Sequence, residues 1–266
     1  MLLLRVQLLE EVHHFAPLLL QKSAGYAGDR LPMNIEQEMD WIKKSKHINN
    51  LDLEVCFQLS DSFYVGDPNS YEQLQDEKFC AALELPSFVR VVPTIARTSE
   101  ALENTNELAS YYKKIIEKSV ALGKPFNEIR QYFWLRLWLW NTEEDIHFSF
   151  PWYDSLSEIQ HFFSWLNNES EEPYIDMDQG WQIDAVRLGE AIHIRQIDPD
   201  EDEEYSNVSL PFEEFLQKVN EVDSRARQII SSLSKELGVD VWSKYRNDAS
   251  FGTEEWQPHQ KTNLSS

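Results

Sequence analysis

The sequence has few cysteines, few basic residues and no long apolar run. Its 266 residues include only two cysteines, Cys56 and Cys80, which are too few for a disulfide framework or a thiolate metal cluster. No apolar stretch approaches the roughly 20 residues that a membrane-spanning helix requires. Lys and Arg number 24 against 46 Asp and Glu, so the net charge is -22. This charge disfavours nucleic acid and anionic membranes as direct partners, because both repel an acidic protein.

The cysteines and the first residues also indicate a compartment. Two unpaired cysteines favour a reducing environment, and we expect each thiol to be a small core side chain. Residues 1–20 are apolar but are interrupted by charged residues and two histidines. They lack the basic start and the small-residue cleavage site of a secretion signal. We therefore expect a strand and a loop there, in a cytoplasmic protein.

Catalytic signatures are also missing from the sequence. It has no His-Glu-x-x-His, no nucleophile elbow, no phosphate-binding loop and no dinucleotide fingerprint. The spacing of Asp198, Asp200 and Asp202 imitates the start of a calcium loop, but Glu203 stands where such a loop needs glycine. We predict no catalytic residue, no cofactor and no metal ligand.

The periodicity of the first half predicts strands and one helix. Residues 51–59 alternate apolar and polar side chains, which is typical of a strand with one buried face, and residues 63–65 are expected to be its hairpin partner. A β-branched run at residues 88–92 predicts another strand. From residue 99 the apolar spacing becomes helical, and Gly123 is expected to end that helix.

The second half begins with two strands and a helix. The aromatic run at residues 132–140 and the alternating residues 146–150 predict paired strands around a turn. Ser155 and Glu158 have the spacing of a capping box, in which each side chain satisfies the other residue's backbone donor. We expect an amphipathic helix to follow.

A hairpin and a long helix complete the predicted elements. Residues 181–188 and 191–197 are joined by a Gly-first pair of residues, which suits a two-residue hairpin. Residues 205–210 predict a third strand. Pro211 then opens a helix whose apolar stripe continues to Leu237, and Gly238 is its expected C-cap.

These elements predict an α+β fold with antiparallel sheets, helices packed on one face, and a long C-terminal helix after a three-stranded meander. We divide the chain into an N-terminal α+β half (residues 1–125), a C-terminal acidic α+β half (residues 126–246) and a flexible tail (residues 247–266). The two halves could also form one continuous domain.

The negative charge is concentrated in one region. Residues 134–204 hold 18 acidic and three basic side chains, a net charge of -15. The densest run is residues 198–204, which we expect in a hairpin loop, and residues 169–178 form a second acidic loop. Such a surface can serve solubility alone, but charge of one sign also accelerates association with a partner of opposite charge.

Aromatic side chains at loop edges are the expected anchors of such a surface, because Trp and Tyr dominate binding hot spots. Trp152 follows a strand-ending proline, and Trp181 follows a turn. The predicted partner-binding residues are Trp152, Asp154, Glu171, Glu172, Asp176, Asp178, Trp181, Asp198, Asp200, Glu201, Asp202, Glu203 and Glu204.

Two segments carry a resemblance to a known group of proteins. They are residues 147–154 (HFSFPWYD) and residues 178–183 (DQGWQI), the latter continuing through the hairpin at residues 187–190 to the long helix. Together they resemble uncharacterised bacterial proteins of polymorphic-toxin immunity neighbourhoods, over about residues 134–245. The resemblance implies a protein that binds one toxin domain and blocks its active site. It carries over no catalytic residue.

The charge and the resemblance point to the same function. Nuclease toxins are basic because they bind phosphates, so an acidic inhibitor can occupy the site of the nucleic acid. We therefore predict an immunity-type inhibitor of a basic toxin domain, for example a nuclease. A non-enzymatic adaptor or scaffold that uses the same surface is the second hypothesis. A hydrolase with an acidic pocket is the third, and two carboxylates converging in a deep cleft would favour it.

Overall fold

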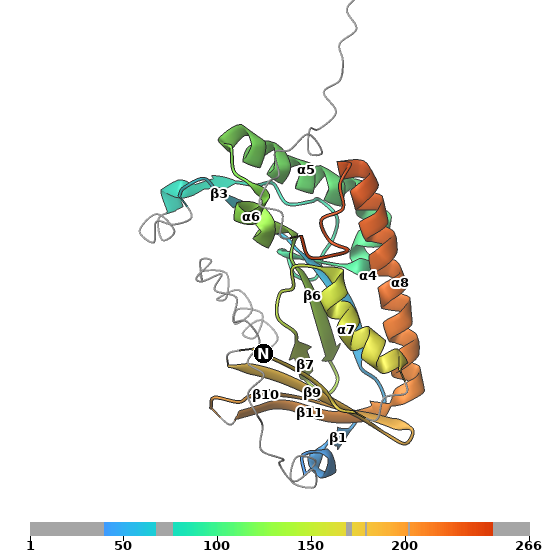
Figure 1. Ribbon diagram of the computed structural model, residues 1–266. Helices are drawn as coiled ribbons and strands as arrows, with labels where there is room; N and C mark the ends of the chain where they lie inside the picture. Colours follow the sequence, from blue (N-terminus) through green and yellow to red (C-terminus); the bar gives the residue numbers. More distant parts are fainter. Residues whose placement is uncertain (1–39, 68–76, 169–171, 179, 202, 247–266) are drawn as a thin grey trace, which may run out of the picture.

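The computed structural model describes residues 40–67, 77–168, 172–178, 180–201 and 203–246. Within these ranges the fold is α+β, with a five-stranded sheet A, a four-stranded sheet B and a two-stranded sheet C (Figure 1). The predicted fold class is confirmed, including the long C-terminal helix after a meander of strands. The strand expected near the start of the chain and the tail at residues 247–266 lie outside the described residues.

The elements are numbered as in Figure 1. The strands are β1 Lys46–His47, β2 Asp52–Gln58, β3 Ser62–Tyr64, β4 Cys80–Ala82, β5 Ile95–Arg97, β6 Leu135–Asn141, β7 Ile146–Ser149, β8 Tyr174–Asp178, β9 Trp181–Leu188, β10 Ala191–Asp198 and β11 Glu203–Pro211. The α-helices are α4 Thr98–Ala101, α5 Thr105–Leu122, α6 Phe126–Ile129, α7 Leu156–Asn167 and α8 Phe212–Leu237, with 3-10 turns η2 Ile42–Lys44, η3 Glu77–Phe79, η4 Leu102–Asn104 and η5 Arg130–Phe133. Sheet A has the order β1-β11-β10-β9-β8, sheet B the order β5-β2-β6-β7, and sheet C pairs β3 with β4.

Sheet B has one face in the main core and one face outside it. Along β6 the side chains of Leu135, Leu137 and Leu139 are fully buried, while the intervening Arg136 and Trp138 are partly exposed. The period-two pattern of the sequence produces this division. Strands β2 and β5 precede residue 125 and strands β6 and β7 follow it, so both proposed halves contribute to one sheet.

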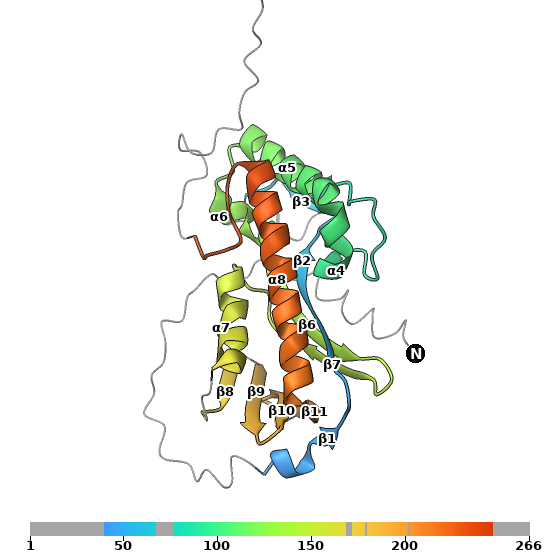
Figure 2. The same cartoon turned by 90° about the vertical axis from the view of Figure 1, so that its right-hand side faces the viewer.

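Helix α8 crosses the molecule and packs against sheet B, sheet A and the helices α4, α5 and α7 (Figure 2). Its buried side chains recur at steps of three and four and form one stripe, as predicted. They are Phe212, Phe215, Val219, Val222, Ala226, Ile229, Ile230 and Leu233. No helix in the described ranges is both long enough and apolar enough to cross a bilayer.

Gly238 ends α8 in the left-handed region, with φ at 72°. A Cβ at this position would meet nothing within 4 Å, so only backbone strain opposes a side chain. We expect Gly238→Ala to lower the free energy of unfolding by about 1 kcal/mol in urea denaturation. Gly238→Asn should lower the free energy of unfolding by less, because Asn tolerates this conformation. An alanine variant as stable as the wild type would contradict the expectation.

Two strand predictions in the first half were wrong. Strand β3 does not pair with β2 but with β4, because β2 is already paired on both sides by β5 and β6. Residues 88–92 form no strand, and Val89 is 90% exposed. The guanidinium of Arg90 donates hydrogen bonds to the carbonyls of Pro86, Phe88 and Pro93, which stabilises a surface loop instead.

Three smaller predictions also need correction. The capping box at α7 is wrong, because the hydroxyl of Ser155 donates to Oε1 of Glu158 and makes no bond to a backbone donor. The aromatic strand begins only at Leu135, after the η5 turn. Cys56 is buried as expected, whereas Cys80 is exposed on β4.

Candidate protein-binding surface

The strand order of sheet A brings two acidic segments to one end of the sheet. Strand β9 lies between β8 and β10, so the β8–β9 turn and the β10–β11 turn share an end (Figure 1). The β9–β10 turn lies at the opposite end, where Phe212 N donates to Glu190 O at the start of α8. We define the acidic end as Asp178, Gly180, Asp198, Asp200, Glu201, Glu203 and Glu204.

Gly180 shows how closely the two turns approach. A Cβ on this residue would lie 3.8 Å from Oδ2 of Asp198 and 3.9 Å from Oδ2 of Asp200. The other oxygen of Asp198, Oδ1, accepts hydrogen bonds from Asp200 N at 2.9 Å and Glu201 N at 3.3 Å. These bonds form an Asx turn, which stabilises the backbone of residues 198–201 and fixes the carboxylate of Asp198.

Tyr205 supplies an exposed aromatic side chain that the sequence analysis missed. A register shift between Gln196 and Ile197 leaves Tyr205 without an opposite residue on β10. Tyr205 is 50% exposed, and its hydroxyl donates to Oδ2 of Asp198 at 3.5 Å. Burial and the nearby Asp198 raise the pKa of Tyr205, so the hydroxyl stays protonated. The signal in the sequence was an aromatic residue directly after the acidic run.

The second predicted acidic loop is in part a strand. Residues Tyr174–Asp178 form β8, and its outward side chains Ile175 and Met177 are 45% and 49% exposed. Asp176 points the other way and accepts hydrogen bonds from the hydroxyls of Tyr153 at 2.5 Å and Tyr174 at 3.2 Å. The loop prediction missed this strand, although Ile175, Asp176, Met177 and Asp178 alternate apolar and acidic side chains with the period of a strand.

Some predicted partner residues lie away from the acidic end or outside the described residues. Glu172 is exposed but precedes β8, at the far end of that strand from Asp178. Glu171 and Asp202 lie outside the described residues. Asp178, Asp198, Asp200, Glu201, Glu203 and Glu204 are the predicted residues that the strand order brings together.

The two predicted tryptophan anchors and Asp154 have other contacts. Trp181 adjoins the acidic end, but its Nε1 donates to Ser149 O at 2.9 Å and its ring packs against the core. Trp152 follows β7 and lies against sheet B, where its ring covers the guanidinium of Arg136. Asp154 accepts a hydrogen bond from Trp134 Nε1 at 2.8 Å and pairs with Arg130.

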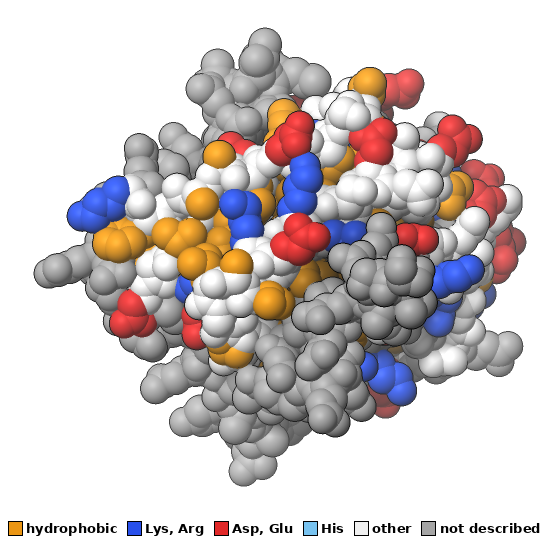
Figure 3. Space-filling view, turned by 90° about the horizontal axis from the view of Figure 1, so that it is seen from above, with side chains coloured by type: hydrophobic (Ala, Val, Ile, Leu, Met, Phe, Trp, Pro, Cys, Tyr) orange, Lys and Arg blue, Asp and Glu red, His pale blue; other side chains and the backbone are white. Residues whose placement is uncertain are grey.

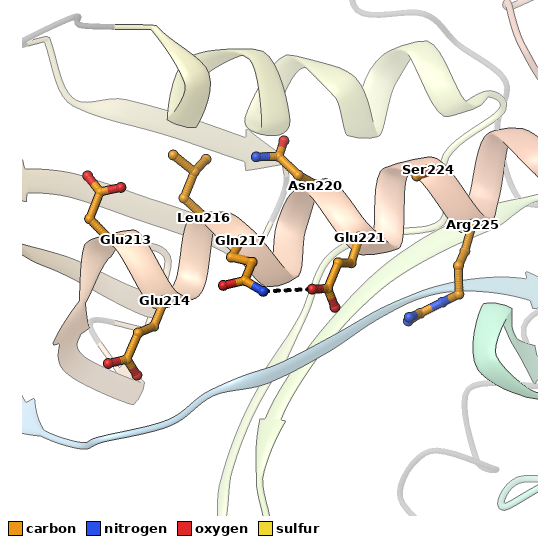
Figure 4. A pocket seen from close by; sticks show the side chains of 8 residues that line it. All are labelled: Glu213, Glu214, Leu216, Gln217, Asn220, Glu221, Ser224 and Arg225. Carbon is orange, nitrogen blue, oxygen red and sulfur yellow. Dashed lines mark hydrogen bonds between the residues drawn. The ribbon is translucent and has the colours of Figure 1, made fainter.

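A separate acidic groove of about 870 Å³ runs along α8 (Figure 4). Glu213 and Glu214 project to different sides of the helix, and Glu221 accepts a hydrogen bond from Gln217 Nε2 at 3.0 Å. Glu213 and Glu214 therefore do not converge on one point of the groove. In the part of the chain that the structure describes, no group of His, Cys, Asp and Glu has the arrangement of a metal site.

Acidic side chains are not concentrated equally over the surface. Seen from the α5 end of the molecule, basic and acidic side chains are interspersed with hydrophobic ones (Figure 3). The acidic end of sheet A, by contrast, gathers carboxylates from two turns.

Comparison with known proteins assigns no family. No protein-family model matches the chain, and no curated protein or solved structure matches it. A function must therefore be inferred from the surface itself.

Proposed function

We propose that this protein is an immunity-type inhibitor that binds and blocks a basic toxin domain through the acidic end of sheet A. The observation that carries the proposal is the approach of the β8–β9 turn to the acidic β10–β11 turn, where a Cβ on Gly180 would lie within 4 Å of the carboxylates of Asp198 and Asp200. Neighbouring carboxylates of one sign produce a strong local field, which attracts a basic partner and orients it during the encounter.

Exposed apolar and aromatic side chains lie on the strands that lead to the acidic end. Tyr205, Ile175 and Met177 are each about half exposed on the strands that carry the acidic turns. An amphipathic tyrosine among carboxylates is a suitable hot-spot residue, because its ring is buried on binding while its hydroxyl keeps a hydrogen bond. In the proposed complex, Tyr205 replaces Trp181 as the aromatic anchor.

The strands that carry the acidic turns are anchored in the core. The inner face of sheet A belongs to the main core, where Ile183, Ile194 and Val208 are nearly or fully buried. A surface that is preorganised loses less conformational entropy on binding, which favours tight complexes. Tight binding is what an inhibitor needs in order to keep a toxin inactive.

If the toxin is a nuclease, the mechanism is competition for its phosphate-binding residues. Lys and Arg side chains that contact nucleic acid would instead pair with the exposed Asp200, Glu201 and Glu203. The proposal places the protein in the cytoplasm, with no direct contact to nucleic acid or membrane. An adaptor protein with the same surface would bind a basic partner without neutralising any toxicity.

Co-expression with the protein encoded next to this one tests the proposal. We expect stable co-purification and rescue of growth, because the inhibitor masks the toxic active site. Binding without toxicity would favour the adaptor hypothesis. A neighbouring protein that is neither toxic nor bound would contradict the proposal, and turnover of a small substrate by the purified chain would favour the hydrolase hypothesis.

A further inference from the structure

Sheet B has an outer face that is rich in tryptophan and arginine. Helices α7 and α8 pack on the leucine side of this sheet (Figures 1 and 2). On the other side, Trp138 and Trp152 pack against a separate small cluster formed by Cys56, Val92 and Ile95. We call Arg136, Trp138, Trp140 and Trp152 the Trp–Arg face.

Arg136 is the unusual residue of this face. Its guanidinium lies 4.3 Å from the ring centroid of Trp152, which covers one side of the planar group. Its Nε atom is buried and has no hydrogen-bond partner in the described part of the chain. The amide oxygen of Gln58, on the neighbouring strand β2, is also buried without a partner.

Three other partly buried arginines of the molecule meet a carboxylate, and Arg90 donates instead to three backbone carbonyls. Arg97 pairs with Glu100 at 2.8 Å, Arg195 with Asp184 at 2.6 Å and Arg225 with Glu54 at 2.9 Å. No ion pair of Arg136 is found among the described residues. A guanidinium that leaves water without a counter-charge destabilises the protein, so an anion at this position would offset that cost.

The residue opposite Arg136 on β2 does not provide the missing charge. Cys56 is fully buried, and burial raises the pKa of its thiol far above neutral pH, so the thiol is uncharged. Burial also lowers the pKa of Arg136, but only to about 10, so the guanidinium remains charged at pH 7. The unmet positive charge is therefore a property of the face at physiological pH.

The surroundings restrict the kind of anion. The indole rings of Trp138 and Trp152 favour a ligand with an apolar or aromatic group next to its charge. The net charge of -22 disfavours phosphates and other multiply charged anions relative to a single carboxylate. Arg136 and the tryptophans lie on the face of a sheet, a shape suited to a protein segment.

We propose that the Trp–Arg face is a second binding surface, which takes a Glu or Asp side chain flanked by aromatic residues in a segment of a partner protein. The carboxylate would accept hydrogen bonds from the guanidinium of Arg136, and the flanking rings would pack against Trp138 and Trp152. This surface is on a different sheet from the acidic end and does not depend on the proposed inhibitor function.

The test uses the full chain labelled with ¹⁵N and follows the indole N–H signals of its tryptophans. The probes are acetyl-Phe-Glu-Phe-amide, the matched acetyl-Phe-Gln-Phe-amide, and inorganic phosphate. We expect the Glu peptide to shift the signals of Trp138 and Trp152 with a dissociation constant on the order of 1 mM. The Gln peptide should bind about tenfold more weakly, because it lacks the charge.

Variants separate recognition by Arg136 from general charge effects. Arg136→Gln should weaken the Glu peptide about tenfold, whereas Arg227→Gln, which removes an equal charge from α8, should leave its affinity unchanged. Circular dichroism checks that each variant folds. If Arg136→Gln does not fold, the Glu-to-Gln difference on the wild type still decides the matter. Equal binding of the two peptides, preferential binding of phosphate, or no binding of the Glu peptide would each overturn the proposal.

Discussion

Reversing three carboxylates of the acidic end, with Asp200→Lys, Glu201→Lys and Glu203→Lys, will weaken binding of the cognate basic domain by about 100-fold and abolish growth rescue. The three side chains are exposed, so their replacement leaves the fold intact. Asp198 is excluded because its carboxylate holds the turn. Surface plasmon resonance with the purified partner measures the loss, and most of it should appear in the association rate.

A matched reversal on α8 provides the control. Glu213→Lys, Glu214→Lys and Glu221→Lys change the net charge by the same amount in the groove at the other end of sheet A (Figure 4). We expect this variant to keep its rescue activity and most of its affinity. An equal loss in both variants would mean that net charge alone matters, and no loss in either would show that the acidic end is not the binding surface.

The second large effect that we expect is a loss of stability when a core tryptophan is removed. Trp242→Ala will lower the free energy of unfolding by about 3–5 kcal/mol, because it deletes a fully buried ring and leaves a cavity. The indole lies 4.9 Å from the ring of Tyr112, 5.6 Å from Phe133 and 6.2 Å from Phe57, measured between centroids. The chain after α8 is thereby packed between α5, η5 and sheet B.

Trp242→Phe is the matched control for this prediction. It keeps an aromatic ring in the core and removes an indole N–H that has no hydrogen-bond partner among the described residues. We therefore expect a loss clearly smaller than that of the alanine variant. Urea denaturation compares the two. An alanine variant within about 0.5 kcal/mol of the wild type would show that this ring is not part of the stabilising core.

The elements with local signals were predictable from the sequence. The hairpin of β9 and β10 has Gly189 at a positive φ, as a Gly-first turn requires. The apolar stripe and the C-terminal glycine of α8 appear in the structure where the sequence places them. In both cases the determining residues are close together in the chain, so short windows contain the information.

The elements that depend on distant partners were not predictable. β2 pairs with β6, and the short β1 pairs in parallel with β11. β8 is short, and its apolar Ile175 and Met177 face outward while Asp176 faces inward, so the strand depends on pairing with β9 along its whole length. Which strands pair depends on competition between partners across the entire chain, and periodicity does not record that competition.

The candidate binding surface also has features that the sequence determined and features that only the fold decided. By itself the sequence determined that carboxylates concentrate in residues 134–204 and that aromatic residues accompany them, because charge and composition need no fold. Only the tertiary structure decided which of these groups share a surface. The order of strands in sheet A placed the β8–β9 turn beside the β10–β11 turn, and the register shift between β10 and β11 left Tyr205 unpaired and exposed. The fold also turned Trp181 toward the core, because one face of a sheet must bury its side chains while the other remains available for binding.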